Sequence, residues 1–394
     1  MGGMSLYSTQ RLRNLRMIVT GGGTGGHTYP ALTTITALQN RLAATGDVPD
    51  LLWVGVANGL EATVAQRNNI PFKAITTGKL RRSTSPQDIG RNIADAFRIP
   101  VGIIQAGLTV ARTRPAVVLS TGGYVSVPIG LAARLLKVPY LLHEQTLILG
   151  LANRILARLA TRILLSHEAS LDHLPPQART RAVVTGNPVR PAMLHGDAAR
   201  GFAAYGLDPA VPLILVTGGA SGAQQINRML TGALPGLLAH CQIVHQCGSL
   251  NYAEMQQVAA ALPDPLAHRY HVADFIHDEM PDLLAAATIV VARSGAGTVA
   301  ELTALGKTCV LIPYPHAAGD EQRITARHLA QQSAAIMLDG DQATPDQLRD
   351  EVLRLLADPP RRQQLAQAAA HQGKPVAAEH VVSEILTVAA GIKP

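Results

Sequence analysis

Short apolar runs rich in β-branched residues recur along the chain, and each precedes a glycine turn or polar loop and then a helical pattern. The first run, RMIVT at 16–20, is followed by GGGTGGH, and AVVLS at 116–120 is followed by TGGY. Similar runs lie at 49–55, 138–145 and 161–167. Runs of this length between helix-length patterns predict parallel strands covered by helices on both faces.

The same alternation begins again near residue 211. The segment VPLILVTGGASGAQQINRML at 211–230 closely parallels the opening stretch of the chain. Later apolar runs lie at 242–248, 270–276, 287–292 and 307–315. We therefore expect an α/β fold with two doubly wound parallel-sheet domains rather than one long sheet.

The domain boundary is predicted in VVTGNPVRP, where two prolines and a glycine interrupt the pattern. We place the N-terminal domain at 17–186 and the C-terminal domain at 187–376. The last apolar pattern, at 377–390, predicts an amphipathic helix.

Composition narrows the class of protein. The 394 residues are 47% apolar and 15% charged, which is typical of a globular protein. The formal net charge of +7 is compatible with an anionic partner such as a nucleotide or a membrane surface. Aromatic residues make up only 3% and no helix-turn-helix pattern is evident, so no nucleic-acid partner is expected.

The cysteines and the chain ends indicate a cytoplasmic location. Cys241, Cys247 and Cys309 form no C-x-x-C pair, and we expect buried free thiols. The first sixteen residues lack the apolar core of a signal peptide, and no apolar stretch reaches the ~20 residues of a membrane span.

The opening glycine loop fits two nucleotide fingerprints incompletely. Gly21, Gly23 and Gly26 match G-x-G-x-x-G, but a dinucleotide site also needs a carboxylate after the next strand, and none occurs before Glu61. His27 stands where a Walker A loop needs lysine. The glycines therefore indicate the close approach of a ligand or of another chain segment.

The loop RSGAGTVAEL at 293–302 is the better candidate for a phosphate site. It follows a predicted strand and opens a helix, and backbone N–H groups at a helix N-terminus bind phosphate. Glu301, one turn further, could accept hydrogen bonds from a ribose. The alternative is that Thr298 and Glu301 only cap the helix.

A set of motifs occurs in the order found in one family. These motifs are GGTGGH with YPAL, GGYVSVP, HEQ, TGNPVR, the glycine loop at 218–222, RSGAGTVAEL and PYPHAAGDEQ. The sequence resembles the MurG family of UDP-N-acetylglucosamine:lipid I N-acetylglucosaminyltransferases from Met17 to about Ala390. The resemblance implies a GT-B fold, in which two Rossmann-like domains face a cleft and the last helix returns to the first domain.

The resemblance also implies site residues. Gly297 and Thr298 would meet the donor diphosphate, Glu301 the ribose, and Gln322 the sugar. The other residues that it assigns to UDP-N-acetylglucosamine (UDP-GlcNAc) are Thr24, Gly25, Gly26, Thr146, Arg190, Ala220, Ser221, Ile276, Ala296 and Glu321. For the lipid I acceptor it implies Gly22, Gly23 and Tyr124. Four positions depart from the usual family residues: Thr146, Ala220, Glu321 and Thr325.

The expected reaction is one direct displacement that inverts the anomeric carbon. UDP-GlcNAc is a substrate, so no cofactor is expected, and no metal is expected either. Helix-terminal N–H groups would then stabilise departing UDP. His27 is the first candidate for the general base, with substrate positioning or helix capping as alternative roles. Glu144 is the second candidate.

The segment 79–105 combines basic and apolar residues, which suits an anionic membrane surface. The alternative is an ordinary amphipathic helix with one solvated face. The residues concerned are Lys79, Arg81, Arg82, Ile89, Arg91, Ile93, Phe97, Arg98 and Ile99. We expect a peripheral protein on the inner face of the cell membrane, with other cell-wall enzymes as further partners. A related GT-B enzyme with another sugar or lipid, and a nucleotide-sugar-binding regulator, are the competing functions.

Overall fold

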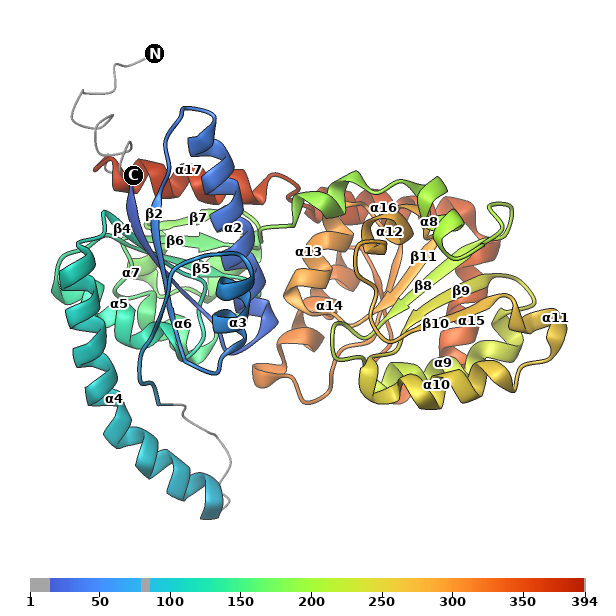
Figure 1. The fold of residues 1–394 in the computed structure, drawn as a ribbon. Helices are drawn as coiled ribbons and strands as arrows, with labels where there is room; N and C mark the ends of the chain where they lie inside the picture. The colour runs from blue at the N-terminus through green and yellow to red at the C-terminus, as the bar shows by residue number, and fades with distance from the viewer. Residues whose placement is uncertain (1–14, 79–85, 393–394) are drawn as a thin grey trace. The chain divides into compact units, whose positions relative to one another are not determined.

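The computed structural model describes residues 15–78 and 86–392, and for residues 86–97 only the backbone (Figure 1). The chain divides into two compact units. The first contains the described residues up to Pro188 together with those from Val376 onward, and the second is Val189–Pro375. Each unit is built on its own parallel sheet, which confirms the predicted fold class of two doubly wound domains.

The first unit contains a seven-stranded sheet in its described part, in the order β3-β2-β1-β4-β5-β6-β7. The strands are β1 (Arg16–Thr20), β2 (Asp50–Gly55), β3 (Phe72–Ala74), β4 (Val117–Ser120), β5 (Tyr140–Glu144), β6 (Arg162–Leu165) and β7 (Ala182–Val184). The helices are α2 (Gly25–Ala43), α3 (Leu60–Arg67), α4 (Pro86–Thr113), α5 (Ser126–Leu135), α6 (Leu151–Leu156), α7 (Pro176–Arg179) and α17 (Ala377–Ala389).

Both faces of this sheet are buried, which explains why its strands are continuously apolar. Met17 and Val19 of β1 pack in a cluster with α2 and α17, whereas Ile18 points into a cluster with α4, α5 and α6. Successive strand residues face opposite sides, so each side of β1 needs apolar residues. The predicted C-terminal helix is α17, and it packs against α2 and β4 of the first unit (Figure 1).

The second unit contains a six-stranded sheet in the order β10-β9-β8-β11-β12-β13. The strands are β8 (Leu213–Thr217), β9 (Gln242–Gln246), β10 (Tyr270–Ala273), β11 (Ile289–Ala292), β12 (Cys309–Leu311) and β13 (Ile336–Met337). The helices are α8 (Ala198–Ala204), α9 (Gln224–Leu237), α10 (Tyr252–Ala260), α11 (Asp264–Ala267), α12 (Met280–Ala286), α13 (Ala296–Ala304), α14 (Glu321–Gln331), α15 (Pro345–Ala357) and α16 (Pro359–Gln372). All three cysteines are free and buried, as predicted.

Each sheet has one point where the strand order reverses, and ligands of such folds bind in the crevice beyond it. In the first unit this point lies between β1 and β4, and in the second it lies between β8 and β11. The loops that follow these four strands are the glycine-rich segments of the sequence. The fold therefore gives each unit one candidate site at the carboxyl edge of its sheet.

Docking of α17 is expected to stabilise the first unit. Ile385 of α17 is fully buried in the apolar cluster that α17 forms with α2 and the sheet. Ile385→Ala should lower the free energy of unfolding by about 2–5 kcal/mol, because it leaves a cavity. Urea unfolding measures this cost. Ser383→Ala, at an exposed position of the same helix, should change it by less than about 0.5 kcal/mol. Equal effects of the two substitutions would contradict this role of α17.

Candidate functional site

The loops after β1 and β4 touch through their backbones. A Cβ on Gly21 would overlap the Thr121 hydroxyl, and one on Gly123 would lie 2.5 Å from the Gly22 carbonyl oxygen. Gly123 also has a φ of +85°, which side-chain-bearing residues rarely adopt. The predicted close approach of another chain segment is thus confirmed for this loop.

A buried carboxylate that was not predicted as a site residue holds the opening loop. Glu61, in the first turn of α3, is 0% exposed and accepts hydrogen bonds from the N–H groups of Gly23 (3.1 Å) and Val56 (3.0 Å). A Cβ on Gly22 or Gly59 would overlap this carboxylate. Glu61 therefore serves as an internal anion for the loop. The sequence signal was a glutamate just after Gly59, at the start of a helix.

His27 lies in the first turn of α2 and is held from two sides. Its Nδ1 lies 2.8 Å from the Thr121 carbonyl oxygen and 3.0 Å from Gln145 Oε1. Its own carbonyl accepts a hydrogen bond from the Thr121 hydroxyl (2.8 Å). Because a carbonyl oxygen can only accept, Nδ1 carries the proton and the neutral ring keeps its lone pair on Nε2.

The predicted residues of the opening loop are brought together at this edge of the sheet. The Tyr124 ring would lie 3.2 Å from a Cβ placed on Gly23, so it covers that glycine. Thr24 is the N-cap of α2 but its side chain makes no capping hydrogen bond. Gly25 and Gly26 begin the helix.

The Glu144 carboxylate is buried and already accepts hydrogen bonds from the protein. It is 1% exposed and accepts hydrogen bonds from the Thr146 N–H (2.9 Å), the Thr146 hydroxyl (2.7 Å) and Asn153 Nδ2 (2.9 Å). With these acceptor positions occupied by protein, the carboxylate organises the loop after β5. The Thr146 hydroxyl, expected near the donor sugar, is engaged in the same loop.

In the second unit, Glu301 forms an ion pair instead of capping α13. Arg190 donates to Glu301 Oε1 from Nη2 (2.9 Å) and from Nε (3.2 Å). Burial raises the pKa of Glu301, and Arg190 opposes that shift. The N-cap of α13 is Gly295, which has no side chain to cap the helix. The helix therefore begins without a cap from the side chain of its own N-cap residue.

The glycines at the start of α13, and Gly219 of the β8 loop, leave space where Gly21, Gly22 and Gly23 of the first unit are filled. A Cβ on Gly297 or Gly219 would meet nothing within 4 Å, and one on Gly295 would meet only Gln322 Nε2 at 4.0 Å. Packing of the described residues does not require glycine at Gly297. Room for a ligand at the α13 N-terminus is the remaining physical reason for it.

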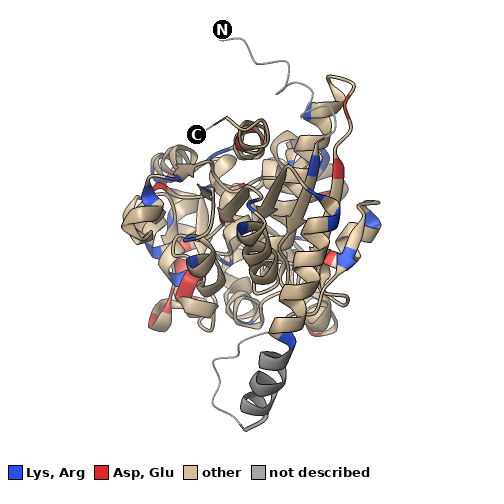
Figure 2. Ribbon diagram, turned by 90° about the vertical axis from the view of Figure 1, so that its left-hand side faces the viewer, with Lys and Arg blue, Asp and Glu red and all other residues tan. Residues whose placement is uncertain are grey.

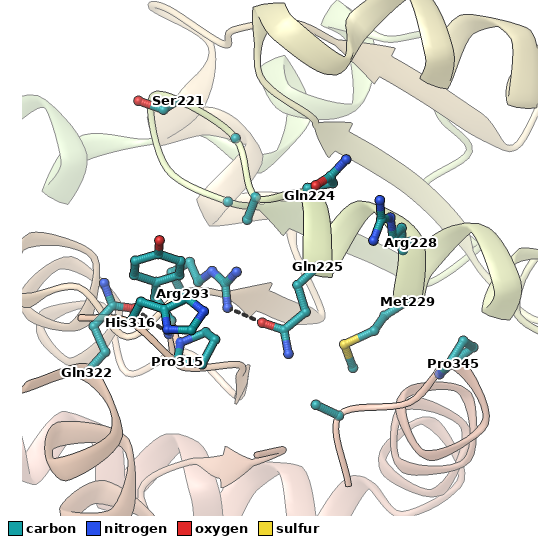
Figure 3. A pocket seen from close by; sticks show the side chains of 15 residues that line it. Ser221, Gln224, Gln225, Arg228, Met229, Arg293, Pro315, His316, Gln322 and Pro345 are labelled. Atoms are coloured by element: carbon teal, nitrogen blue, oxygen red, sulfur yellow. Dashed lines mark hydrogen bonds between the residues drawn. The ribbon is translucent and has the colours of Figure 1, made fainter. Parts of the chain in front are cut away.

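A pocket of about 940 Å³ lies beside this loop, and Figure 3 shows the side chains that line it. Arg293 Nη1 donates to Gln225 Oε1 (2.8 Å) and to the carbonyls of Ile312 and Pro313. Gln322 is fixed on the wall, because its Oε1 accepts from the Tyr314 N–H (3.0 Å). The lining contains Arg228, Arg293 and His316 but no carboxylate. Arg228 and Gln225 were not predicted as site residues, and Arg293 was part of the RSGAGTVAEL motif but was given no role.

The other predicted donor residues take varied positions. Ser221 lies on the pocket rim, and Ala220 beside it is exposed. Ile276 is a core residue, 3% exposed, and its N–H donates to Gln246 Oε1 (2.9 Å). Glu321 begins α14, and Ala296 begins α13. Within residues 15–78 and 86–392, no group of three or more His, Cys, Asp or Glu could hold a metal ion.

Comparison with known proteins identifies the family. Residues 17–165 match the N-terminal domain of glycosyltransferase family 28, and residues 213–381 match its C-terminal domain. The chain is 35% identical to the UDP-N-acetylglucosamine–N-acetylmuramyl-(pentapeptide) pyrophosphoryl-undecaprenol N-acetylglucosamine transferase of Desulforudis audaxviator. That alignment covers 94% of this chain and 98% of the relative. The chain belongs to the MurG family.

Further relatives support this membership. The transferase of the same name from Halalkalibacterium halodurans is 34% identical, over 93% of this chain and 97% of its own length. The crystal structure of Acinetobacter baumannii MurG is similar with a TM-score of 0.73 at 28% identity, covering 94% of this chain and 99% of that one. Membership of the MurG family confirms the resemblance and the GT-B fold class inferred from the motifs.

The Arg190–Glu301 pair gives a pH-dependent prediction. Arg190→Ala leaves the Glu301 carboxylate, 21% exposed, without its partner and should cost about 1 kcal/mol of unfolding free energy at pH 7.5. Without Arg190 the pKa of Glu301 rises further. A buried carboxyl group with a raised pKa destabilises the folded protein only while it is ionised. The cost of Arg190→Ala should therefore shrink as the pH falls towards 5 and Glu301 takes up a proton.

Urea unfolding of Arg190→Ala at pH 7.5 and pH 5 measures this dependence. The matched control is Arg327→Ala, at an exposed position of α14 in the same unit. It should be near neutral at both pH values. A cost of Arg190→Ala that is the same at both pH values would show that Arg190 does not act through the Glu301 charge.

Proposed function

We propose that this chain transfers N-acetylglucosamine from UDP-GlcNAc to the C4 hydroxyl of the muramyl sugar of lipid I, an undecaprenyl-pyrophosphoryl-N-acetylmuramyl-pentapeptide. Its relatives carry the name of that transferase over nearly their full length. The observation that carries the proposal within the chain is the α13 N-terminus. Its N-cap residue is a glycine, it has room at Gly297, and it lies one turn from the Arg190–Glu301 pair.

The second unit holds the nucleotide sugar in this proposal. The backbone N–H groups of Gly297 and Thr298 point at the diphosphate, where the helix dipole adds to their attraction. Glu301 accepts hydrogen bonds from the ribose hydroxyls. Gln322, already fixed by the Tyr314 N–H, presents its Nε2 to the sugar. Ser221 lines the same pocket from the β8 loop.

The chemical step is one displacement at the anomeric carbon. The acceptor oxygen forms a bond to C1, the C1–O bond to the β-phosphate breaks, and its electron pair leaves on UDP. The N–H groups at α13 stabilise the negative charge that develops there. Attack from the face opposite the leaving group turns an α-linked donor into a β-linked product.

The first unit supplies the acceptor site and the base. The opening loop, with Gly22, Gly23 and Tyr124, receives the acceptor. Gly25 and Gly26, which follow it, form the start of α2. His27 Nε2 takes the hydroxyl proton, because the ring is held with its proton on Nδ1. Glu144 is assigned to loop organisation rather than to proton transfer, because its carboxylate is buried and occupied.

The reaction is tested by the release of UDP in the presence of a lipid I analogue. UDP-GlcNAc should turn over about 10–100-fold faster than UDP-GalNAc or UDP-glucose, because unpaired polar groups in the sugar site penalise the wrong sugar. Comparable rates for all three, or a preference for another sugar, would contradict the donor assignment and favour a related transferase.

His27→Ala in the same assay separates chemistry from binding. Loss of a general base should lower kcat by about 10²–10⁴-fold. The UDP Kd should stay the same, because the donor groups lie in the other unit. Near-normal kcat in this variant would remove His27 from the role of base.

We also propose that the first unit contacts an anionic membrane. Three helices on one side of its sheet present exposed apolar side chains: Val101, Ile104 and Leu108 on α4, Leu135 and Leu136 at the end of α5, and Leu151 and Ile155 on α6. Figure 2 shows basic positions near both ends of the described part of α4. No helix among the described residues is long and apolar enough to cross a membrane. Lys79, Arg81 and Arg82 lie outside the described residues.

Liposome flotation at low salt tests this contact. The double variant Ile104→Asp, Leu108→Asp should bind vesicles of anionic lipid several-fold less than the unaltered chain, because both side chains are more than half exposed (64% and 51%). The control is Leu250→Asp, a 93% exposed leucine of the second unit, which should bind normally. Absence of binding by the unaltered chain, or equal loss in the control, would reject the surface.

A further inference from the structure

Three backbone carbonyls determine where every proton lies in a chain of side chains that ends at His27. His143 Nε2 lies 2.9 Å from the Gly186 carbonyl oxygen, so Nε2 carries the proton and Nδ1 accepts. Gln145 Nε2 lies 2.9 Å from His143 Nδ1 and 3.2 Å from the His143 carbonyl. Only an amide N–H₂ group can face these two acceptors. Gln145 Oε1 therefore faces His27.

The last link of the chain follows from the third carbonyl. His27 Nδ1 lies 2.8 Å from the Thr121 carbonyl and 3.0 Å from Gln145 Oε1, so one N–H is shared by two acceptors. Both acceptors favour the same tautomer. No described residue hydrogen-bonds to His27 Nε2, which is the atom that must take up a proton.

Burial keeps the hydrogen-bonded side chains of His143 and Gln145 in one protonation state. His143 and Gln145 are each 1% exposed. Burial lowers the pKa of His143 to about 4, although the Gly186 carbonyl opposes that shift and a charge on His27 adds to it. His143 is therefore neutral at the pH where a histidine base works. Its Nδ1 stays an acceptor, so the Gln145 amide keeps its N–H₂ group towards His143.

We propose that Gln145, held by His143 and the Gly186 carbonyl, is a positioning residue that sets both the direction and the basicity of His27. The inference rests on the proposed role of His27 as base. Gln145 touches neither reacting atom and acts only through the imidazole. Its oxygen stabilises the imidazolium that forms when Nε2 takes the proton of the acceptor hydroxyl.

A neutral acceptor at this place has a different consequence from a carboxylate. In a Ser-His-Asp triad an aspartate accepts from histidine Nδ1 and favours the charged ring. A buried carboxylate beside His27 would leave the ring protonated, and so useless as a base, up to higher pH. Glutamine supports the ring without that penalty.

The carboxylates of the neighbouring elements are directed elsewhere. Glu144, next to Gln145 in the chain, is turned towards Thr146 and Asn153. Glu61, from α3, binds the N–H groups of Gly23 and Val56. Among the described residues, Tyr124 lies beside the glycine loop, and His143 interacts electrostatically with His27. The acceptors of the His27 Nδ1 proton are thus both uncharged.

The test measures the pKa and tautomer of His27 directly, by NMR of ¹⁵N-histidine-labelled full-length protein. His27→Ala identifies the His27 signals by their loss. In the unaltered chain we expect protonated Nδ1 and unprotonated Nε2. Gln145→Leu should lower the pKa of His27 by several tenths of a unit, and Gln145→Glu should raise it by about one unit or more. Gln39→Leu and Gln39→Glu, at an exposed position of α2, should leave it unchanged.

The pH profile of kcat/KM provides the functional readout. Its acidic limb should move to lower pH in Gln145→Leu and to higher pH in Gln145→Glu, with kcat reduced about 10–100-fold in the leucine variant. His143→Asn keeps an acceptor for Gln145 Nε2 and should restore most of the rate lost in His143→Leu. If Gln145 had a merely structural role, the acidic limb would not move in opposite directions in the leucine and glutamate variants.

The outcomes separate this inference from the proposed function. If the Gln145 variants leave the His27 pKa and tautomer unchanged while His27→Ala still abolishes turnover, the positioning role is wrong and the base stands. If the His27 pKa moves but the acidic limb does not follow it, His27 is not the base. Thermal unfolding of each variant guards against misfolding, since the NMR readout requires only a folded first unit.

Discussion

Two loops share the carboxyl edge of the first sheet because their backbones can touch. The strand order reverses between β1 and β4, which places the loops after these strands side by side. Contact of Gly21 with Thr121, and of Gly123 with the Gly22 carbonyl, closes the gap between them. The Thr121 carbonyl can reach His27 Nδ1 only because the loops lie this close. The orientation of the histidine is therefore a consequence of a glycine packing contact.

The buried Glu61 carboxylate completes the same arrangement from the other side. It takes up the Gly23 N–H, so this part of the loop is satisfied by the protein itself. A glycine-rich loop after the first strand is usually associated with bound phosphate. Here most of its glycines serve packing, and the uncapped start of α2 at Gly25 and Gly26 is what remains for an anion.

The second unit repeats the topology, and Gly218 and Gly222 of its β8 loop are packed in the same way, but three of its other glycines are not. Gly219 and Gly297 have open space where a Cβ would lie, and Gly295 starts α13 without a capping side chain. The pocket beside it is lined by Arg228 and Arg293 and by no carboxylate, which adds positive charge to that edge. One fold thus yields a packed loop that orients a histidine and an open loop suited to a diphosphate. This contrast is the physical basis for dividing base and donor between the units.

The sequence by itself determined the two parallel sheets, the returning helix α17 and the family, because strand periodicity, glycine turns and ordered motifs are local signals. It also singled out His27 and Glu301 by their spacing from glycine loops. Only the tertiary structure decided what those residues touch. Glu61 became a loop anchor and Arg190 the partner of Glu301, because these contacts join residues that are 38 and 111 positions apart in the chain. Hydrogen-bond partners at such separations are set by the packing of strands, and no local pattern encodes them.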